Sequence, residues 1–471
     1  MSSSIPGICW PLAALLAILC TATSCFRWGS TDPRSVGSID EVRRLSERDD
    51  INLLFVLIDT LRADNLGSYG YARDTSPSLD YLAETGVRFS RHLAQSSWTK
   101  TSMASLWTGV YPVRTGVMRS EHAISPEAQM AAEILQEAGF RTIGLWRNGW
   151  VAPNFGFDQG FDVYQRPLTR RPPPALRRGK PHLSIEGTDN DAVDAFSEFL
   201  RIQRGERWFL YVHLMDVHQY LYDEDSAIFG TEYLDMYDNS VRREDGIVGA
   251  LLHRLADSGS LDKTLVVLAS DHGEAFGERG IEGHAQSVYR ESTEVPFIIA
   301  FPFLLEPGIV VEGRTRNVDV WPTLLDLLGL PPLPDADGRS LLPSILAAAE
   351  AQEEFPDDPE SPLAIAHLDR SWGRPGHPTR PIVAVSRGPH RLLYAPALDG
   401  STMERLFDRE ESESEERNVA EDQPEVVSEL REHAIDYLNT SPISWGEEPP
   451  EIELDEMQLN QLRALGYAVD Q

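Results

Sequence analysis

The sequence predicts an α/β fold with a largely parallel central sheet flanked by helices, followed by a smaller C-terminal α+β domain. Two continuously apolar runs, residues 52–58 and 265–269, carry this prediction, because a strand covered by helices on both faces is apolar throughout. Further apolar runs alternate with helical patterns, which is typical of parallel sheets. Beyond residue 363, short strand-like runs and one helical pattern at 425–438 predict the smaller domain.

Both apolar runs end at side chains that bind metals. Asp59 directly follows the first run, and Asp271 and His272 follow the second. Ligand sites in such sheets lie at the carboxyl ends of the strands, so we expect these three side chains to meet at one edge. Carboxylate oxygens and an imidazole suit a hard or borderline divalent cation. We therefore predict one divalent metal ion, Mn, Zn, Ca or Mg.

The composition limits the partners of the chain. Its 471 residues are 41% hydrophobic, enough for a large core. Forty-two basic residues against 74 acidic ones give a formal charge of -32, which argues against nucleic acid and anionic membrane surfaces as partners. An anionic substrate must therefore be attracted by a local positive site.

All three cysteines, Cys9, Cys20 and Cys25, lie in the first 25 residues, so the folded part has neither a disulfide nor cysteine chemistry. An apolar stretch at residues 8–20 and small residues before Cys25 are typical of a secretory signal with a lipoprotein-type cysteine. No Lys or Arg precedes the stretch, which leaves an uncleaved membrane anchor as the alternative. We expect export to the periplasm or the cell surface, with Cys25 as the lipid attachment point.

The chain divides into six predicted segments. A polar tether separates the signal segment from the main domain, and an acidic, proline-containing linker separates the main domain from the small one. The boundaries are 1–25 for the signal segment, 26–50 for the tether, 51–346 for the catalytic domain, 347–362 for the linker, 363–445 for the small domain and 446–471 for the tail.

A polar block at residues 96–109 contains a candidate for chemistry. Thr99 can cap a helix over residues 100–107 that ends at Gly109. A hydroxyl at that position lies among unpaired backbone N–H groups and the positive end of the helix dipole, which suits a tetrahedral oxyanion. The alternative is an ordinary capping threonine. We expect Lys100, beside it, to bind the substrate.

Two further segments bring histidines towards the same edge. A third apolar run, residues 208–218, ends in polar side chains and carries His213, Asp216 and His218. His284 lies on a loop after residue 283, from which it can reach the site.

Five motifs lie in order along the chain, at residues 58–64, 98–109, 215–218, 270–274 and 283–284. Together they resemble the motifs of the sulfatases, within the alkaline phosphatase superfamily. The resemblance covers about residues 50–345, extends to the small C-terminal unit, and implies an alkaline phosphatase-like fold.

The resemblance also implies roles for individual residues. Asp59, Asp271 and His272 would bind one divalent metal, and Thr99 would be the nucleophile. The remaining residues are substrate contacts: His218 and His284 would contact the transferred group or protonate the leaving oxygen, and Asn148 would bind a substrate oxygen.

The chain departs from the sulfatase pattern at the nucleophile. Sulfatases carry Cys-x-Pro-Ser-Arg, or a serine version, whose first residue is oxidised to formylglycine; here Thr99 and Met103 stand at the first and last positions. Threonine carries a methyl on Cβ and cannot give an aldehyde. Thr60 also replaces the second of two adjacent aspartates. The pattern is closer to superfamily members that use an unmodified threonine on phosphonates, phosphodiesters or phosphoethanolamine.

These observations predict an exported, metal-dependent ester hydrolase that uses Thr99 on a phosphate, phosphodiester or phosphonate ester. A threonine alkoxide would form an ester that water must cleave in a second step, which phosphothreonine allows. A sulfuric ester hydrolase is the alternative, followed by a phosphoethanolamine-type transferase and an inactive binding protein. The substrate would be an anionic ester of a small molecule, glycan or lipid.

Overall fold

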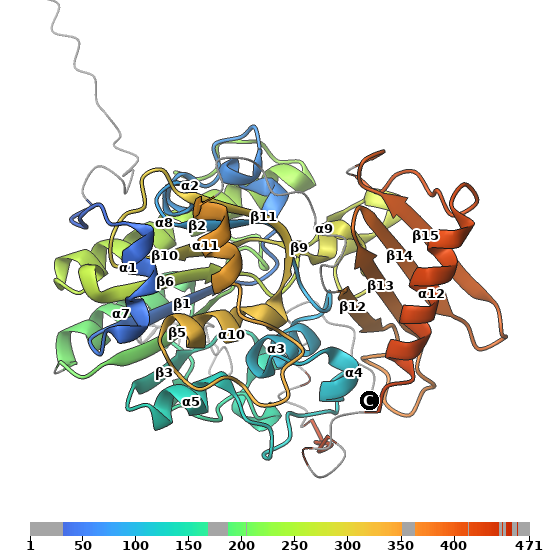
Figure 1. The fold of residues 1–471 in the computed structure, drawn as a ribbon, viewed down its shortest axis with the longest axis horizontal. Helices are drawn as coiled ribbons and strands as arrows, with labels where there is room; N and C mark the ends of the chain where they lie inside the picture. The colour runs from blue at the N-terminus through green and yellow to red at the C-terminus, as the bar shows by residue number, and fades with distance from the viewer. Residues whose placement is uncertain are drawn as a thin grey trace, which may run out of the picture.

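The computed structural model describes residues 32–167, 187–203, 205–350, 363–412 and 414–441, and the isolated positions 445, 449–454 and 459. Its centre is a nine-stranded sheet with the order β11-β2-β10-β6-β1-β5-β3-β4, in which β9 pairs with β2 (Figure 1). The strands are β1 (Asn52–Ile58), β2 (Val87–Leu93), β3 (Arg141–Leu145), β4 (Val163–Gln165), β5 (Trp208–Leu214), β6 (Thr264–Ala269), β9 (Glu294–Val295), β10 (Phe297–Ala300) and β11 (Ile309–Arg316).

The middle of the sheet is parallel, as the apolar runs predicted. Strand β1 lies between β5 and β6 and is parallel to both, with Ile58 opposite Leu214 and Leu57 opposite Ala269. The three strands therefore end level with one another, and the segments that follow them share one edge. Strand β10 breaks the pattern, since it runs antiparallel to both β6 and β2.

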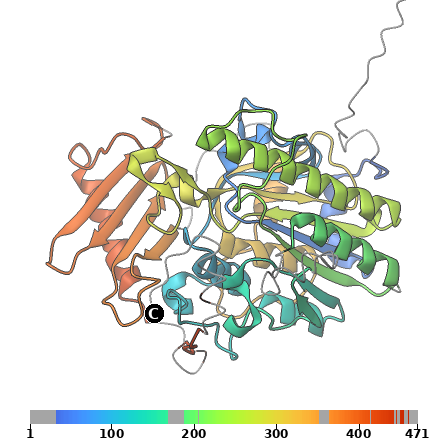
Figure 2. The same cartoon turned by 180° about the vertical axis from the view of Figure 1, so that it is seen from behind.

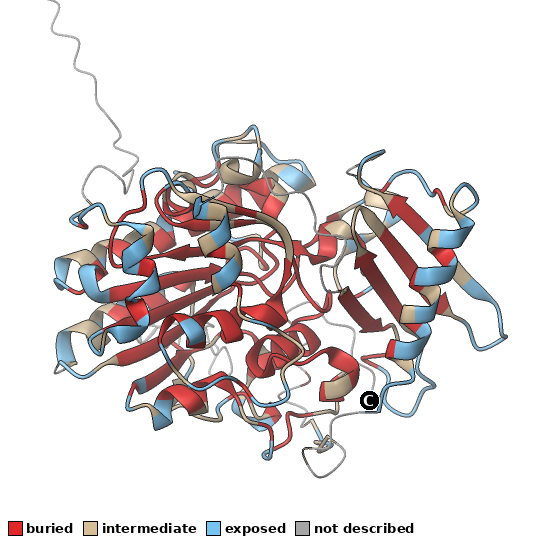
Figure 3. Cartoon of the chain, in the orientation of Figure 1, coloured by how far each residue is buried: buried red, intermediate tan, exposed pale blue. Residues whose placement is uncertain are grey.

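Helices cover both faces of the sheet, so every residue of β1 is buried. Alternate β1 residues enter two separate cores: Leu53, Phe55 and Leu57 enter one, and the residues between them enter the other. Figures 1 and 2 show the two helical layers from opposite sides, and Figure 3 shows the buried sheet between them. One layer holds α1 (Ile39–Arg43), α3 (Thr99–Thr108), α5 (Ala131–Glu137), α10 (Asn317–Leu327) and α11 (Leu342–Glu350); the other holds α2 (Pro77–Glu84), α7 (Asp189–Ile202) and α8 (Tyr233–Asp257).

The remaining elements are short or belong to the small C-terminal unit. Helices α4 (Pro112–Thr115) and α9 (Arg290–Thr293) and the pair β7 (Ala275–Phe276) and β8 (Glu282–Gly283) lie in connections of the main unit. In the C-terminal unit α12 packs on an antiparallel sheet of order β12-β13-β14-β15, which confirms the predicted α+β class. Its elements are β12 (Ala364–Asp369), β13 (Pro381–Arg387), β14 (His390–Pro396), β15 (Thr402–Asp408) and α12 (Pro424–Leu438).

Several predicted boundaries differ from the structure. The predicted tether, 26–50, is wrong for its described part, because Val42 of α1 and Leu45 are buried in the core and hold this segment against the main unit. The predicted linker begins inside α11, and residues 351–362 lie outside the described part.

The predicted signal segment, with Cys25, also lies outside the described residues, so export and lipid attachment stay predictions. Within the described part of the chain, every helix is too short or too polar to cross a membrane.

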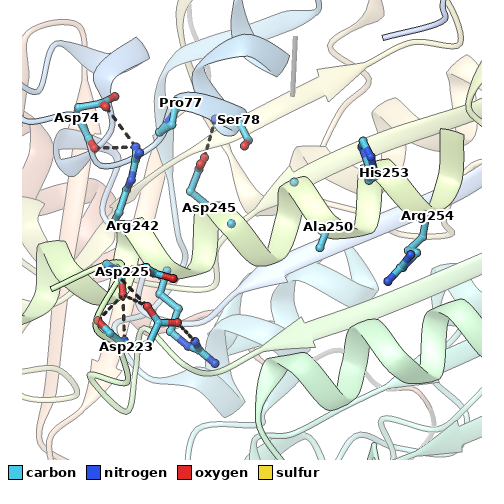
Figure 4. Close-up of a pocket in the computed structure, with 14 residues that line it drawn as sticks. Asp74, Pro77, Ser78, Asp223, Asp225, Arg242, Asp245, Ala250, His253 and Arg254 are labelled. Carbon is cyan, nitrogen blue, oxygen red and sulfur yellow. Dashed lines mark hydrogen bonds and ion pairs between the residues drawn. The ribbon is translucent and has the colours of Figure 1, made fainter. Parts of the chain in front are cut away.

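A groove of about 810 Å³ lies along α8 beside the start of α2 (Figure 4). In it the Asp245 carboxylate accepts the backbone N–H groups of Ser78, at 2.8 Å, and Leu79, at 2.9 Å. These are orphan donors at the start of α2, so Asp245 caps that helix from another element. Burial raises the pKa of Asp245 to about 7.

This raised pKa predicts a pH-dependent stability. The folded state holds the Asp245 proton more tightly than the unfolded state, whose pKa is about 3.9, so Asp245 destabilises the fold progressively as pH rises from about 4 to 7. Asp245→Asn keeps an acceptor for the two N–H groups without the charge. The free energy of unfolding of Asp245→Asn, measured relative to that of the wild type, should therefore rise by about 2 kcal/mol from pH 5 to pH 8.

Urea unfolding of both proteins at the two pH values measures this gain. Asp399→Asn, in an exposed turn, is the control. A stability difference between Asp245→Asn and wild type that is the same at both pH values would show that the Asp245 carboxylate has an ordinary pKa.

Candidate active site

The three predicted metal ligands meet at the carboxyl edge of the sheet. Asp59, Asp271 and His272 are fully buried, and each offers one ligand atom within 4.8 Å of the other two. Asp59 Oδ1 and Asp271 Oδ2 have no hydrogen-bond partner among the described residues. His272 Nε2 lies 3.8 Å from the first of these oxygens and 3.4 Å from the second. Two buried carboxylate oxygens and a ring nitrogen that converge in this way fit a divalent cation.

The protonation of His272 follows from its surroundings. Its Nδ1 lies 3.0 Å from the Gly273 carbonyl oxygen, which can only accept a hydrogen bond, so Nδ1 carries the proton. The neutral tautomer with this proton directs its Nε2 lone pair towards the space between the two carboxylates, and it is the form in which histidine binds metals.

The other oxygen of each carboxylate is fixed by the protein. Asp59 Oδ2 accepts hydrogen bonds from Asn148 Nδ2 at 2.7 Å and from His213 Nε2 at 3.0 Å. Asp271 Oδ1 accepts the His272 backbone N–H at 2.9 Å. Each carboxylate therefore directs one oxygen at its protein partners and leaves the other for a cation.

The pKa values of the two carboxylates reflect their burial and the charges around them. Burial opposes ionisation of Asp59, but His218 and the hydrogen bond from His213 hold the pKa of Asp59 below its ordinary value. Burial and the neighbouring Asp59 raise the pKa of Asp271. A cation between the two would relieve this repulsion.

Thr99 lies beside the cluster. It is the first residue of α3 rather than its cap, which corrects the predicted helix start by one position. Its Oγ1 is 3.1 Å from His272 Nε2 and accepts a hydrogen bond from Asn148 Nδ2 at 3.3 Å. All ten residues of α3 are buried, so the helix holds this hydroxyl rigidly.

Thr60 has a strained backbone at the end of β1. Its φ is 61°, a left-handed value that a β-branched residue rarely adopts. The conformation is held on both sides: the Thr60 hydroxyl donates to the Asp59 carbonyl at 2.6 Å, and the Thr60 carbonyl accepts the Tyr237 hydroxyl at 2.8 Å. These two hydrogen bonds therefore hold the backbone in a strained conformation at the residue that follows Asp59, a predicted metal ligand.

His218 and His284 face each other at the site, with ring centroids 5.0 Å apart, and His284 lies 4.6 Å from the His272 ring. Glu274 Oε2 is 3.1 Å from His284 Nδ1. Burial lowers the pKa of both imidazoles, but Glu274 outweighs it and raises the pKa of His284. The pKa of His218 falls to about 4 because burial dominates there. The two neighbouring imidazoles therefore have pKa values shifted in opposite directions.

Lys100 lies in an aromatic environment. It is fully buried, its Nζ donates to the Ser120 carbonyl at 2.8 Å, and that Nζ lies 3.6 Å from the centre of the Phe155 ring. Burial lowers its pKa well below the ordinary value. These contacts give Lys100 a structural role, and its assignment to substrate binding stays a prediction.

The structure also shows residues whose part in the site the sequence did not reveal. Glu274 lies in the motif at residues 270–274, and its position just after two strand-end ligands is the signal in the sequence for its part in the site. The sequence places His213 at this edge without a role, and the structure shows that its ring contacts the Asp59 carboxylate. The C-terminal unit approaches the site as well: Trp372 stacks on Trp98 at 4.5 Å and donates to the Ala285 carbonyl at 3.1 Å.

Comparisons with known proteins agree with this fold. Residues 51–330 match the model of the family described as Sulfatase. N-acetylgalactosamine-6-O-sulfatase of Bacteroides thetaiotaomicron is 23% identical over 478 residues, covering 81% of this chain and 92% of that protein. Steryl-sulfatase of Mus musculus is 27% identical over 412 residues, covering 64% and 66%. The phosphonate monoester hydrolase of Agrobacterium radiobacter has the same fold, with a TM-score of 0.62 and 19% identity, covering 82% of this chain and 95% of that one.

The family match defines a hydrolase that acts on ester bonds, and the fold is an alkaline phosphatase-like α/β architecture. The chain belongs to the sulfatase family.

Proposed function

We propose that this chain hydrolyses an anionic ester with unmodified Thr99 as the nucleophile, beside a divalent cation held by Asp59, Asp271 and His272. The observation that carries the proposal is the position of the Thr99 hydroxyl, 3.1 Å from His272 Nε2 and next to two carboxylate oxygens without partners among the described residues. When bound, the cation would lower the pKa of a hydroxyl and polarise a substrate oxygen.

The protein's own groups would supply orientation and protons. The Asn148 amide donates to Thr99 Oγ1 and to Asp59 Oδ2, so it fixes the hydroxyl relative to the predicted ligand set. Because Glu274 raises the pKa of His284, this imidazole is the better candidate of the two for protonating a leaving oxygen. Neutral His218 beside it can accept a hydrogen bond from the substrate or from the water of the second step.

The transferred group has two candidates. The curated relatives reported above are sulfatases, so a sulfuric ester is the class that the comparisons favour. The residue at position 99 favours a phosphate, phosphodiester or phosphonate ester, because a threonine ester must be cleaved by water and phosphothreonine allows this. The family match supports ester hydrolysis in either case.

A panel of esters with one common aryl leaving group tests the function. Sulfate, phosphate, phosphodiester and phosphonate esters are assayed with Mn, Zn, Mg and Ca after removal of bound metal. We expect hydrolysis that depends on added metal. A kcat/KM highest for sulfate would identify a sulfatase that works through threonine, and one highest for a phosphorus ester would support the second candidate. Metal-independent rates, or no hydrolysis of any ester, would contradict the proposal.

A further inference from the structure

Five ionisable side chains form a network behind His218 and Asn148 that the proposed reaction does not use. Four of them are buried, and Arg243 is partly exposed on the groove along α8. Buried charges are costly unless they are closely paired, so such a network imposes one geometry on the segments that carry it. The Arg147 network consists of Arg147, Asp189, Asp216, Arg243 and Glu244.

Arg147 connects the network to Asn148. Its Nη1 donates to Asp189 Oδ1 at 2.5 Å and to Asp216 Oδ1 at 2.6 Å. The next residue, Asn148, donates to both Thr99 Oγ1 and Asp59 Oδ2. The paired Arg147 guanidinium therefore anchors the turn that carries Asn148, whose amide orients the proposed nucleophile.

Asp189 connects the network to His218. Its Oδ2 accepts the backbone N–H groups of Met215, at 2.7 Å, and Asp216, at 2.6 Å. These residues begin the tight turn that carries His218, in which Leu221 N donates to the Asp216 carbonyl at 2.9 Å. One carboxylate thus pairs with Arg147 through one oxygen and fixes the His218 turn through the other.

The three acids of the network also resemble a second cation site, since their ligand atoms lie within 4.8 Å of one another. However, the Arg147 guanidinium already bridges Asp189 and Asp216, and Arg243 Nε donates to Asp216 Oδ2 at 3.1 Å. Neither Glu244 oxygen has a donor among the described residues, and burial raises the pKa of Glu244 well above its ordinary value. A neutral Glu244 would leave two guanidinium groups opposite two carboxylates, an arrangement whose charges balance without a metal.

We propose that Asp189 and Arg147 are positioning residues, which lock the His218 turn to the Asn148 turn so that both side chains stay in register with Thr99. This inference rests on the proposed function of the site. It assigns no contact with the substrate to either residue.

A double-mutant cycle tests whether Asp189 acts through the His218 turn. Asp189→Asn keeps the size of the side chain and removes the charge that pairs with Arg147. We expect kcat to fall roughly ten- to a hundredfold, with a smaller change in KM and with metal content unchanged. In a His218→Ala background the same substitution should cost less than about threefold, because the residue through which it acts is absent. Arg147→Lys, which keeps the charge but loses the bridging fork, should also lower kcat with metal content unchanged, and its loss should shrink in an Asn148→Ala background, because Arg147 directly precedes Asn148.

Matched variants separate the possible failures. Asp223→Asn, whose carboxylate pairs with Arg243 and not with Arg147, should stay within about twofold of wild type. A full loss that persists in the His218→Ala background, a loss of metal, or a wild-type kcat in both Asp189→Asn and Arg147→Lys would overturn the inference. Thr99→Ala is measured in parallel: if it retains turnover, the proposed function fails rather than this inference alone.

Discussion

Thr99→Ala is expected to lower kcat by at least roughly 10³-fold, which corresponds to about 4 kcal/mol of barrier. The substitution removes the only hydroxyl that contacts both His272 and Asn148 among the described residues, and with it the atom that would form the covalent ester. Thr99→Ser keeps the hydroxyl and should retain part of the rate. Steady-state kinetics with the best ester of the panel measures both variants.

Thr101→Ala provides a matched control on the same helix. The Thr101 hydroxyl is also buried, but it donates to the Val117 carbonyl and does not contact the proposed ligands. It should lose stability and retain most of kcat, since a buried hydroxyl–carbonyl bond contributes about 1 kcal/mol. Turnover of Thr99→Ala close to that of Thr101→Ala would exclude Thr99 as the nucleophile.

The second large effect is expected for Asp271→Asn. The amide keeps an oxygen for the His272 backbone N–H, but it removes the charge of the pair and replaces an oxygen ligand by an NH₂ group. Metal content should fall from about one ion per chain to well below it, and kcat/KM by roughly 10²-fold or more. Elemental analysis and kinetics on the same preparations measure the two quantities.

Thermal unfolding gives a readout of the same substitution without activity. Metal that binds only the folded state raises the Tm of the wild type, and this rise should disappear in Asp271→Asn. Without metal, the variant should be at least as stable as the wild type, because it removes one of two like charges that repel each other in the cluster. Asp245→Asn, a buried aspartate outside the site, should keep the metal-dependent rise. An unchanged metal content in Asp271→Asn would show that the ligand set is wrong.

The sequence predicts the strands that lie deepest in the sheet and misses β2 and β11, which lie near one edge. Every residue of β1 and of β6 is buried, so their apolar runs are unambiguous. Strand β2 contains Arg88, Ser90 and Arg91, all half-buried, and β11 is half-buried over most of its length. Because these strands are only partly covered, their side chains do not form the continuous apolar run that identified the central strands.

The candidate site is also only partly predictable from the sequence: its strand-end ligands are, and the residues behind them are not. Asp59 and Asp271 directly follow buried strands, so chain order alone places them together. The network behind them depends on pairs far apart in the chain: Asp189 contacts Arg147 and Asp216, which lie 42 and 27 positions away. No local pattern marks such a pair, and the strained φ of Thr60 is equally invisible before the fold is known.

The most direct test of a threonine nucleophile is to trap the covalent intermediate. Wild-type enzyme is mixed with the best aryl ester, quenched in acid within the first turnover, and digested, and the peptide that contains Thr99 is analysed by mass spectrometry. The account predicts a phospho or sulfo group on Thr99 that appears in the burst and is absent from Thr99→Ala. Turnover in which Thr99 stays unmodified at every time point, or an adduct on a different residue, would contradict it.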